Sequence, residues 1–417
     1  MDFCGPRRFQ RRQQESWDFL AVELLGGFRP IVTSDAIGLN KGQEQLAKRA
    51  PWFSLVETCG KILFEGAELA IIHPRVSTLI KVAVLGTGSL GKHHARIYSE
   101  LAATGVLEFA GVFDRDATLG REIARKHGVK AFASEVEAAE AADALSIVTP
   151  TNTHFDLARM LLERGRHVLV EKPMTNTGEE AAQLIALAQK RNCTLQVGHV
   201  ERFNPVFAYL EKAAGNPRFI ETHRLSKYPA RSMDIGVVLD LMIHDLDVVL
   251  AFVRSPVESV DATGIAVLSE SEDIANARIK FANGCVANLT ASRISPEQMR
   301  KIRVFSGGED PSYVSLDYRE QKGYIYRLAK AGEKKSSVLR AFLTAKHSKV
   351  VSEFAGKKIV SEPVPIEKSE PLKLELEHFV ESITARSQPR VSGESAKEAL
   401  DLALEITRQI RAGEKLS

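Results

Sequence analysis

A short apolar segment, a glycine-rich turn and a helical stretch follow one another directly from residue 80. Lys81–Leu85 has the composition of a buried strand, and the turn after it reads Gly-Thr-Gly-Ser-Leu-Gly. Gly86 permits a tight turn, Gly88 lets a pyrophosphate approach the backbone, and Gly91 allows the helix to pack closely on the strand. The segment therefore predicts a turn that holds the phosphates of a dinucleotide at a helix N-terminus. The other residues of this turn are Thr87, Ser89 and Leu90.

A carboxylate follows the next strand-like segment, 108–113. Asp114 lies 23 residues after Gly91. A carboxylate at this place accepts hydrogen bonds from the adenosine ribose and repels a 2′-phosphate, which favours NAD as the cofactor. Arg115 could instead pair with that phosphate, so NADP stays open. The alternative is a glycine-rich turn without a ligand, which the flanking strand, the helix and the acidic residue together disfavour.

Strands and helices alternate as far as residue 200. Further strand-like segments at 144–149, 167–170 and 194–197 are separated by helical stretches. This alternation predicts βαβ units and a doubly wound parallel sheet. Thr177 and Glu180 have the spacing of a capping box that opens one of the helices.

After residue 200 the pattern changes to longer alternating strands. Asn283-Gly284 separates two of them and is a strong signal for a hairpin. A helix is expected over 236–252, and it would cover one face of an antiparallel sheet. The chain is therefore expected to be α/β, with a dinucleotide-binding domain, a sheet domain and C-terminal helices. These parts are residues 80–200, 201–370 and 371–417.

Composition excludes several classes of protein. The formal net charge is +3, which gives no reason to expect binding to nucleic acid or to an anionic membrane. No apolar run approaches the ~18 residues that span a bilayer. The four cysteines are scattered without the spacing of metal ligands, so we expect no metal site and a reducing, cytoplasmic setting.

Residues 1–79 differ from the rest of the chain. They contain a basic cluster at Arg7, Arg8, Arg11 and Arg12, and no apolar segment of the kind found in secretory signals follows it. Acidic residues near this cluster make a transit peptide a weaker interpretation of the segment. A loosely packed appendage, or a start site assigned too early, is the favoured interpretation, and we expect this segment to be dispensable.

Polar residues follow two expected strands at the edge where a doubly wound sheet binds its ligand. Thr149, Pro150, Asn152 and His154 come after the strand that ends near 149, and Glu171-Lys172-Pro173 follows the next strand. We expect these residues to face the cofactor crevice. A solvated surface lysine is the alternative for Lys172.

Asp240 and His244 are four residues apart in the expected helix 236–252 and would share one helical face. A carboxylate one turn away biases the tautomer and charge of a histidine, as a general base near neutral pH requires. A surface ion pair is the alternative for these two residues taken alone. A metal site is disfavoured, because one histidine and scattered aspartates form no closed ligand set.

These motifs, in this order, resemble the Gfo/Idh/MocA oxidoreductase family from residue 80 to the C-terminus. The resemblance rests on the glycine-rich turn, Thr149-Pro150 with His154, Glu171-Lys172-Pro173, the segment 198–205 and Asp240-x-x-x-His244. It implies a Rossmann domain followed by an α/β domain with an open antiparallel sheet. It also implies that Lys172, Asp240 and His244 form the catalytic group, that Lys172-Pro173 is a cis peptide, and that the chain forms homodimers or homotetramers.

Within the family, the segments 198–205, 240–247 and 291–295 resemble members that oxidise the 3-hydroxyl of UDP-N-acetylglucosamine on a route to amide-linked lipid A. The substrate implied is thus a nucleotide sugar. Residues 1–79 have no counterpart in this resemblance.

The roles that this resemblance implies can be matched to atoms of the reaction. His244 would take the hydroxyl proton, Asp240 would orient His244 or the substrate, and Lys172 would hydrogen-bond the reacting oxygen. The candidates for contacts with substrate, including its diphosphate, are Arg202, Asn204, Arg231 and Arg293. Two alternatives stay open: a dehydrogenase for another sugar, an inositol or a dihydrodiol, and a non-catalytic dinucleotide sensor.

Overall fold

The protein is described from a computed structural model. It describes residues 79–228, 235–309, 311–329, 349–354 (backbone only) and 357–414. Leu79–Ser417 forms one compact unit. The expected extension, up to residue 78, and Arg231 lie outside the described residues.

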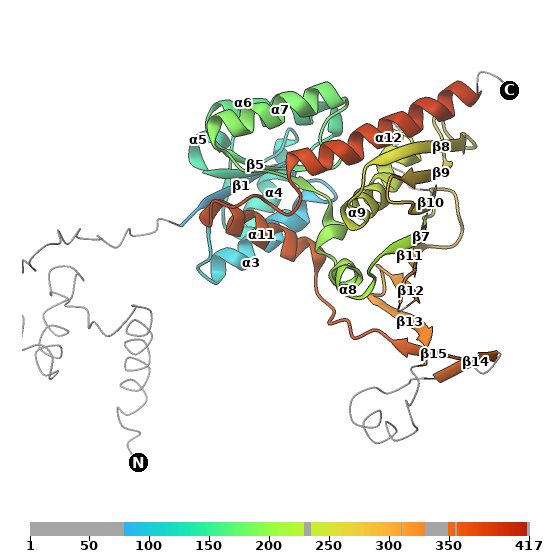
Figure 1. The fold of residues 1–417 in the computed structure, drawn as a ribbon. Helices are drawn as coiled ribbons and strands as arrows, with labels where there is room; N and C mark the ends of the chain where they lie inside the picture. The colour runs from blue at the N-terminus through green and yellow to red at the C-terminus, as the bar shows by residue number, and fades with distance from the viewer. Residues whose placement is uncertain (1–78, 229–234, 310, 330–348, 355–356, 415–417) are drawn as a thin grey trace, which may run out of the picture. The chain divides into compact units, whose positions relative to one another are not determined.

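The first domain is built on a six-stranded sheet with the order β3-β2-β1-β4-β5-β6, in which all neighbours are parallel. This confirms the doubly wound sheet (Figure 1). The strands are β1 (Lys81–Leu85), β2 (Glu108–Phe113), β3 (Lys130–Ala131), β4 (Ala144–Ile147), β5 (His167–Glu171) and β6 (Leu195–Gly198). The helical segments between them are α3 (Gly91–Ala103), α4 (Ala117–His127), α5 (Glu135–Ala141), η3 (Thr151–Thr153), α6 (His154–Glu163) and α7 (Gly178–Arg191).

Local signals set the ends of these helices. The Thr177 side chain accepts a hydrogen bond from the backbone N–H of Glu180, as a capping box requires. Gly128 ends α4 with φ +67°, in the left-handed region that favours glycine. Both positions were predictable because capping depends on neighbours within one turn.

The second domain contains a nine-stranded sheet, whose order is β14-β15-β13-β12-β11-β7-β10-β9-β8. Its strands are β7 (Pro217–Leu225), β8 (Val257–Ile265), β9 (Ile274–Phe281), β10 (Val286–Ser292), β11 (Met299–Ser306), β12 (Ser312–Asp317), β13 (Lys322–Leu328), β14 (Lys349–Phe354) and β15 (Lys357–Pro363). The helical segments before and after β7 are η4 (Val200–Phe203), α8 (Pro205–Ala213), η5 (Val238–Met242) and α9 (Ile243–Val253).

The expectation of an antiparallel sheet needs one correction. The β9–β10 hairpin around Gly284 is antiparallel as predicted, but β10 pairs with β7 in parallel. The chain leaves β7, crosses one face of the sheet through η5 and α9, and returns beside β7 after the β8–β9–β10 meander. A helical crossover of this kind is what joins parallel strands.

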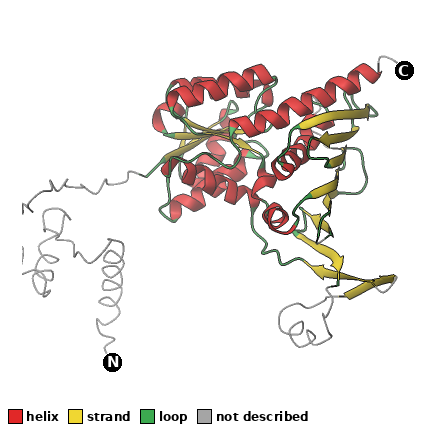
Figure 2. Cartoon of the chain, in the orientation of Figure 1, coloured by secondary structure: helices red, strands yellow, loops and turns green. Residues whose placement is uncertain are grey.

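Alternation along the strands divides this sheet into a covered face and an open one. In Figure 2 the helices lie on one side of the sheet. On the other side, one aromatic ring from each of the neighbouring strands β7, β11, β12 and β13 forms a row. The centroids of successive rings are 5.7, 4.5 and 5.0 Å apart. We call this row the aromatic ladder; it consists of Phe219, Phe305, Tyr313 and Tyr326.

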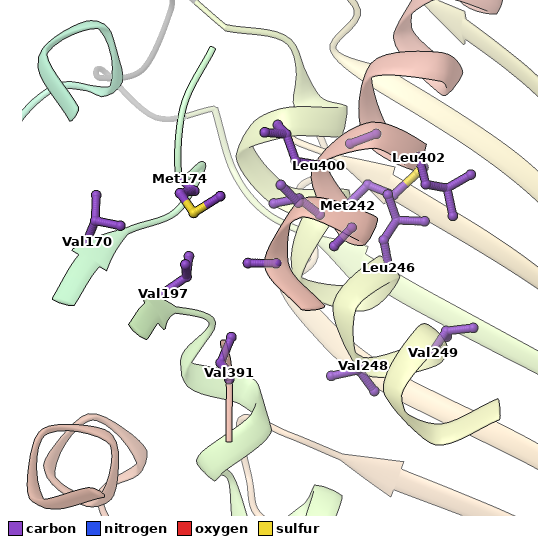
Figure 3. Packing of buried hydrophobic residues seen from close by; sticks show 14 of the residues in the cluster. Val170, Met174, Val197, Met242, Leu246, Val248, Val249, Val391, Leu400 and Leu402 are labelled. Atoms are coloured by element: carbon purple, nitrogen blue, oxygen red, sulfur yellow. The ribbon is translucent and has the colours of Figure 1, made fainter. Parts of the chain in front are cut away.

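The C-terminal helices α11 (Pro371–Thr384) and α12 (Gly393–Glu414) return to the first domain. Helix α11 packs on α3, and α12 packs on both α7 and α9. Figure 3 shows Val170 and Val197 at the strand ends in the same core as Met242, Leu246 and Leu400. This shared core holds the carboxyl edge of the parallel sheet against η5 and α9.

We expect a chain that begins at Ser77 to fold as the full chain does. The compact unit starts at Leu79, and β1, the central strand, starts at Lys81. Its thermal midpoint should lie within about 3 °C of the full chain, by calorimetry. A chain that begins at Gly88 is the control: it lacks β1 and should not fold. A truncation at Ser77 that is insoluble, beside a soluble full chain, would show that the N-terminal residues are needed.

Candidate active site

Lys172 connects the two domains. This residue directly follows β5. Its ammonium donates a hydrogen bond to the Asp240 carbonyl oxygen at 2.7 Å and pairs with Asp240 Oδ1 at 3.2 Å. The two side chains are 17% and 16% exposed, so the pair is largely shielded from water. The Lys172-Pro173 peptide is cis, as the resemblance implied. The Asp240 carboxylate, expected to orient His244 or the substrate, holds the lysine in this structure.

The helix expected over 236–252 begins with the π-helical turn η5 and continues as α9. Asp240 lies in η5 and His244 is the second residue of α9. No hydrogen bond joins them in the described part of the chain, where His244 Nδ1 has no partner. The wider π turn breaks the simple four-residue spacing. Such turns occur often at functional sites.

Several cations surround His244. Burial lowers the pKa of His244 well below 6.5, and the charges of Lys172, Arg224 and Arg300 lower it further. The His199 ring lies edge-on to the His244 ring, at 6.2 Å between centroids. At neutral pH His244 is therefore neutral and can accept a proton.

A buried ion network fixes the helix that carries His244. Arg224 on β7 donates to both carboxylate oxygens of Asp245 at 3.1 and 3.0 Å and to Glu201 Oε1 at 3.1 and 3.2 Å. These three residues are nearly inaccessible to solvent. The sequence analysis did not find Arg224 or His199 as parts of the site. Arg224 belongs to no local motif. His199 lies in the segment 198–205 on which the resemblance rests, but its contact with the His244 ring comes from another element.

The glycine-rich turn fits a dinucleotide. A Cβ at Gly91 would overlap the Gly86 carbonyl oxygen, so the helix can approach only without one. A Cβ at Gly88 would meet nothing within 4 Å, which leaves open space above the turn for a phosphate. Asp114 Oδ2 accepts hydrogen bonds from Thr87 N and Oγ1 at 2.6 and 2.8 Å, and Arg115 beside it is exposed. Asp114 thus also holds the turn.

The residues expected at the cofactor crevice fall into two groups, exposed residues on the loop after β4 and a buried residue that supports that loop. Pro150 and Asn152 are exposed on the loop after β4. His154 is 1% exposed, and its ring nitrogens lie 2.9 Å from the Pro173 carbonyl oxygen and 2.8 Å from that of Thr149. His154 therefore braces two loops rather than facing the crevice.

Glu171 also supports the loop from below. Its carboxylate lies 3.2 Å from His94 Nε2 and accepts a hydrogen bond from Lys172 N at 3.3 Å. It fills the space where a Cβ on Gly198 would lie. Glu171, predicted to contact the cofactor, is 7% exposed, and its contact with Lys172 N helps to position that residue.

Two of the residues predicted to contact substrate, Arg293 and Asn204, have buried side chains with hydrogen-bond partners inside the protein. Arg293 is 1% exposed, bonds Asp273 Oδ1 at 2.8 Å and donates to the Ile235 carbonyl oxygen at 2.7 Å. It anchors the segment before η5. Asn204 is 3% exposed and caps α8, its Oδ1 accepting from Val206 N at 3.1 Å.

Arg202 is only partly committed. Its guanidinium pairs with Asp247 Oδ1 at 3.3 Å, donates to the Arg390 carbonyl oxygen at 3.2 Å and lies over the Phe207 ring. Its side chain is 11% exposed. Arg231 lies outside the described residues.

Two general searches of the described residues give negative results. Within them, no group of three or more His, Cys, Asp or Glu side chains could hold a metal ion. No helix in the same ranges has the length and apolarity to cross a membrane.

Two family models match the chain. Residues 80–199 match an oxidoreductase family with an NAD-binding Rossmann fold, and residues 209–308 match a Gfo/Idh/MocA C-terminal domain. Together they cover the parallel sheet and much of the nine-stranded sheet.

Individual relatives agree with these models. UDP-N-acetylglucosamine 3-dehydrogenase from Acidithiobacillus ferrooxidans is 35% identical over 334 residues, which cover 80% of this chain and 98% of the relative. Its solved structure aligns over the same shares with a TM-score of 0.70. Scyllo-inositol 2-dehydrogenase (NAD(+)) from Bacillus subtilis is 27% identical, over 80% of this chain and 95% of its own. The chain belongs to the Gfo/Idh/MocA family of NAD-binding oxidoreductases, whose named members here are dehydrogenases acting on hydroxyl groups.

Proposed function

We propose that this protein oxidises the 3-hydroxyl of UDP-N-acetylglucosamine with NAD. The observation that carries the proposal is the Lys172–Asp240 pair near a neutral His244, in a chain that matches a UDP-N-acetylglucosamine 3-dehydrogenase along 98% of that enzyme's length. A secondary alcohol must lose a proton from oxygen and a hydride from carbon, and these residues offer the groups for the first of these losses.

The chain's own residues would act on the hydroxyl in two ways. His244, neutral because of its surroundings, takes the hydroxyl proton. The Lys172 ammonium hydrogen-bonds the same oxygen as it becomes a carbonyl, and Asp240 keeps that ammonium in place. NAD, when bound, supplies the hydride acceptor. Most of the remaining work of the protein is positioning.

The choice of NAD over NADP is part of this proposal. Asp114 ends β2, and its Oδ1 accepts only one hydrogen bond, from Asp116 N, in the described residues. The remaining lone pair of Asp114 Oδ1 can accept a hydrogen bond from a ribose hydroxyl, and the negative charge of this carboxylate repels a 2′-phosphate. The exposed Arg115 is the feature that favours NADP.

A second candidate is oxidation of an inositol. The Bacillus subtilis relative, at 27% identity over 95% of its length, favours it. Lys172 and His244 would serve either alcohol, so the site's chemistry alone does not decide. The higher identity of the nucleotide-sugar enzyme does favour the first candidate. A non-catalytic sensor is disfavoured, because such a protein needs neither residue.

The cellular setting follows from the substrate. A nucleotide sugar and NAD are both cytoplasmic metabolites, so we place the reaction in the cytoplasm. Its ketone product is a substrate for transamination, which is the step that leads to amide-linked lipid A in the enzymes that this chain resembles.

We also propose that the aromatic ladder mediates assembly into a homodimer or homotetramer. Phe305 is 37% exposed, and Tyr324, Leu328 and Ile359 nearby are 47%, 39% and 37% exposed. A contiguous apolar face of this kind is typical of an interface.

The assembly is tested by Phe305→Asp combined with Tyr324→Asp. We expect the double variant to run as a smaller species than the wild type in light scattering, because each carboxylate would be desolvated in the interface. Val106→Asp, at a residue 48% exposed on the first domain, is the control and should not change the mass. A wild type that is monomeric would refute this assembly.

Replacing either reacting side chain should slow turnover without unfolding the protein. We expect Lys172→Ala and His244→Ala each to reduce kcat by about 10²–10⁴-fold, the range for positioned acid–base groups. Lys126→Ala, at an exposed position on α4, is the control and should keep the wild-type rate. NAD affinity, measured by fluorescence titration, should survive in His244→Ala. Normal kcat in both variants would contradict the assignment.

The low pKa of His244 sets the pH dependence. Protonation abolishes its role as a base, so kcat/KM should fall on the acid side as pH drops through this pKa. Because burial and neighbouring cations lower the pKa of His244, that fall should be centred below pH 6.5. A profile of kcat/KM against pH measures it. An acid limb centred above pH 6.5 would show that another group acts as the base.

The substrate is tested by NADH formation with UDP-N-acetylglucosamine, in the presence of a coupled aminotransferase that removes the ketone. Free N-acetylglucosamine, myo-inositol and scyllo-inositol are run beside it, each with NAD and with NADP. We expect activity on the nucleotide sugar with NAD as the better cofactor. Activity on an inositol or a free sugar, with none on the nucleotide sugar, would select the second candidate.

A further inference from the structure

Strand β11 carries an arginine toward each face of the nine-stranded sheet. Ile302 and Val304 are buried beneath the helices, and by alternation Arg300 lies on the same face. Arg303, on the opposite face, bonds the His223 ring. Arg300 pairs in register with Arg224 on β7, the residue that holds the helix of His244. Arg300 is therefore on the side of the sheet that faces the candidate active site.

Arg300 has only a weak partner in the described structure. Its guanidinium lies 3.9 Å from Glu201 Oε1, an oxygen that already accepts two bonds from Arg224. Its side chain is 55% exposed. The other nearby carboxylate, Asp245, is also bonded to Arg224 through both oxygens. Glu201 and Asp245 are thus already paired with the buried Arg224, and most of the positive charge of Arg300 is not balanced by a carboxylate of the described residues.

The backbone of a second arginine, Arg319, lies beside the start of β11. Tyr318 N donates to the Arg300 carbonyl oxygen at 2.8 Å, which sets Arg319 next to the start of β11. Arg319 is exposed, and its guanidinium bonds the neutral amide of Gln298. The Arg224 guanidinium contacts the same Glu201 oxygen as Arg300, so cations crowd at this place. An anion at this place would relieve that crowding.

Arg300 is linked to the helix of His244 through the ion network: its guanidinium lies 3.9 Å from Glu201 Oε1, and Arg224 joins Glu201 to Asp245, the residue after His244. The charge of Arg300 is close enough to His244 to lower the pKa of that histidine. Of the other arginines expected to meet a diphosphate, Arg293 is buried against Asp273, and Arg202 is partly engaged by Asp247. Arginine is suited to phosphate because its planar fork makes paired, charge-assisted hydrogen bonds.

We propose that Arg300, with Arg319 beside it, binds the diphosphate of a nucleotide sugar while Lys172 and His244 meet the sugar hydroxyl. The diphosphate is attached at C1 of the sugar, two ring positions from the reacting C3. Binding there orients the 3-hydroxyl without touching it. This inference rests on the proposed function and names the residues that select a nucleotide sugar over a free sugar or an inositol.

The test compares Arg300→Gln with Arg303→Gln, two arginines on opposite faces of one strand. Loss of a charge-assisted contact should raise KM for UDP-N-acetylglucosamine by about 10–100-fold, with kcat changed by less than about threefold. Arg303→Gln should match the wild type in both constants. Arg319→Gln, at an exposed residue, provides a second variant if Arg300→Gln is unstable, and should also raise KM.

A separate titration of UDP into the NAD-loaded protein distinguishes this proposal from the substrate assignment. If the wild type binds UDP, and Arg300→Gln loses that binding, the subsite is supported even where UDP-N-acetylglucosamine is not oxidised. If the wild type oxidises UDP-N-acetylglucosamine and Arg300→Gln and Arg319→Gln keep its KM, the subsite is wrong and the proposed function stands. A wild type that neither binds UDP nor oxidises the nucleotide sugar would overturn both.

Discussion

The contact between Lys172 and Asp240 is the constraint on which the candidate site depends. It joins the end of β5 to the π turn η5, so a side chain of the parallel sheet is fixed against the helix of the second domain. Both side chains are more than four-fifths buried, and removal of one would leave an uncompensated charge. The cis peptide at Pro173, the brace formed by His154 and the buried Glu171 all support the same lysine. The first domain alone would leave its ammonium without this partner.

The second feature of the site is an excess of positive charge around one uncharged histidine. The charge of Arg224 is balanced by Glu201 and Asp245. The charges of Lys172 and Arg300 are less completely balanced by carboxylates, so part of their positive charge still acts on His244. Such a setting keeps His244 neutral as a proton acceptor. It also favours a negatively charged substrate. One electrostatic arrangement thus accounts for both the proposed base and the proposed preference for a diphosphate.

Sequence reasoning succeeded where the cause was local. The glycine-rich turn, the cap at Thr177 and the hairpin at Gly284 depend on residues within one or two turns. It failed where a partner is distant along the chain. Arg293 is paired with a carboxylate twenty residues away, and Asp240 with a lysine sixty-eight residues away. Spacing also could not reveal η5, because the π turn covers only five residues, too few to establish a period of their own. Strands β14 and β15 were not predicted, because their short apolar runs lie within the Lys- and Ser-rich segment 329–370.

The central claim is that a hydride leaves C3 of a nucleotide sugar while the hydroxyl proton passes to the protein. The most direct measurement uses UDP-N-acetylglucosamine deuterated only at C3, with mass spectrometry of the reduced cofactor. We expect one deuterium in the cofactor for each ketone formed, and slower turnover if hydride transfer limits the rate. Reduced cofactor without deuterium, formed from the labelled substrate at the normal rate, would show that another carbon is oxidised and would contradict the account.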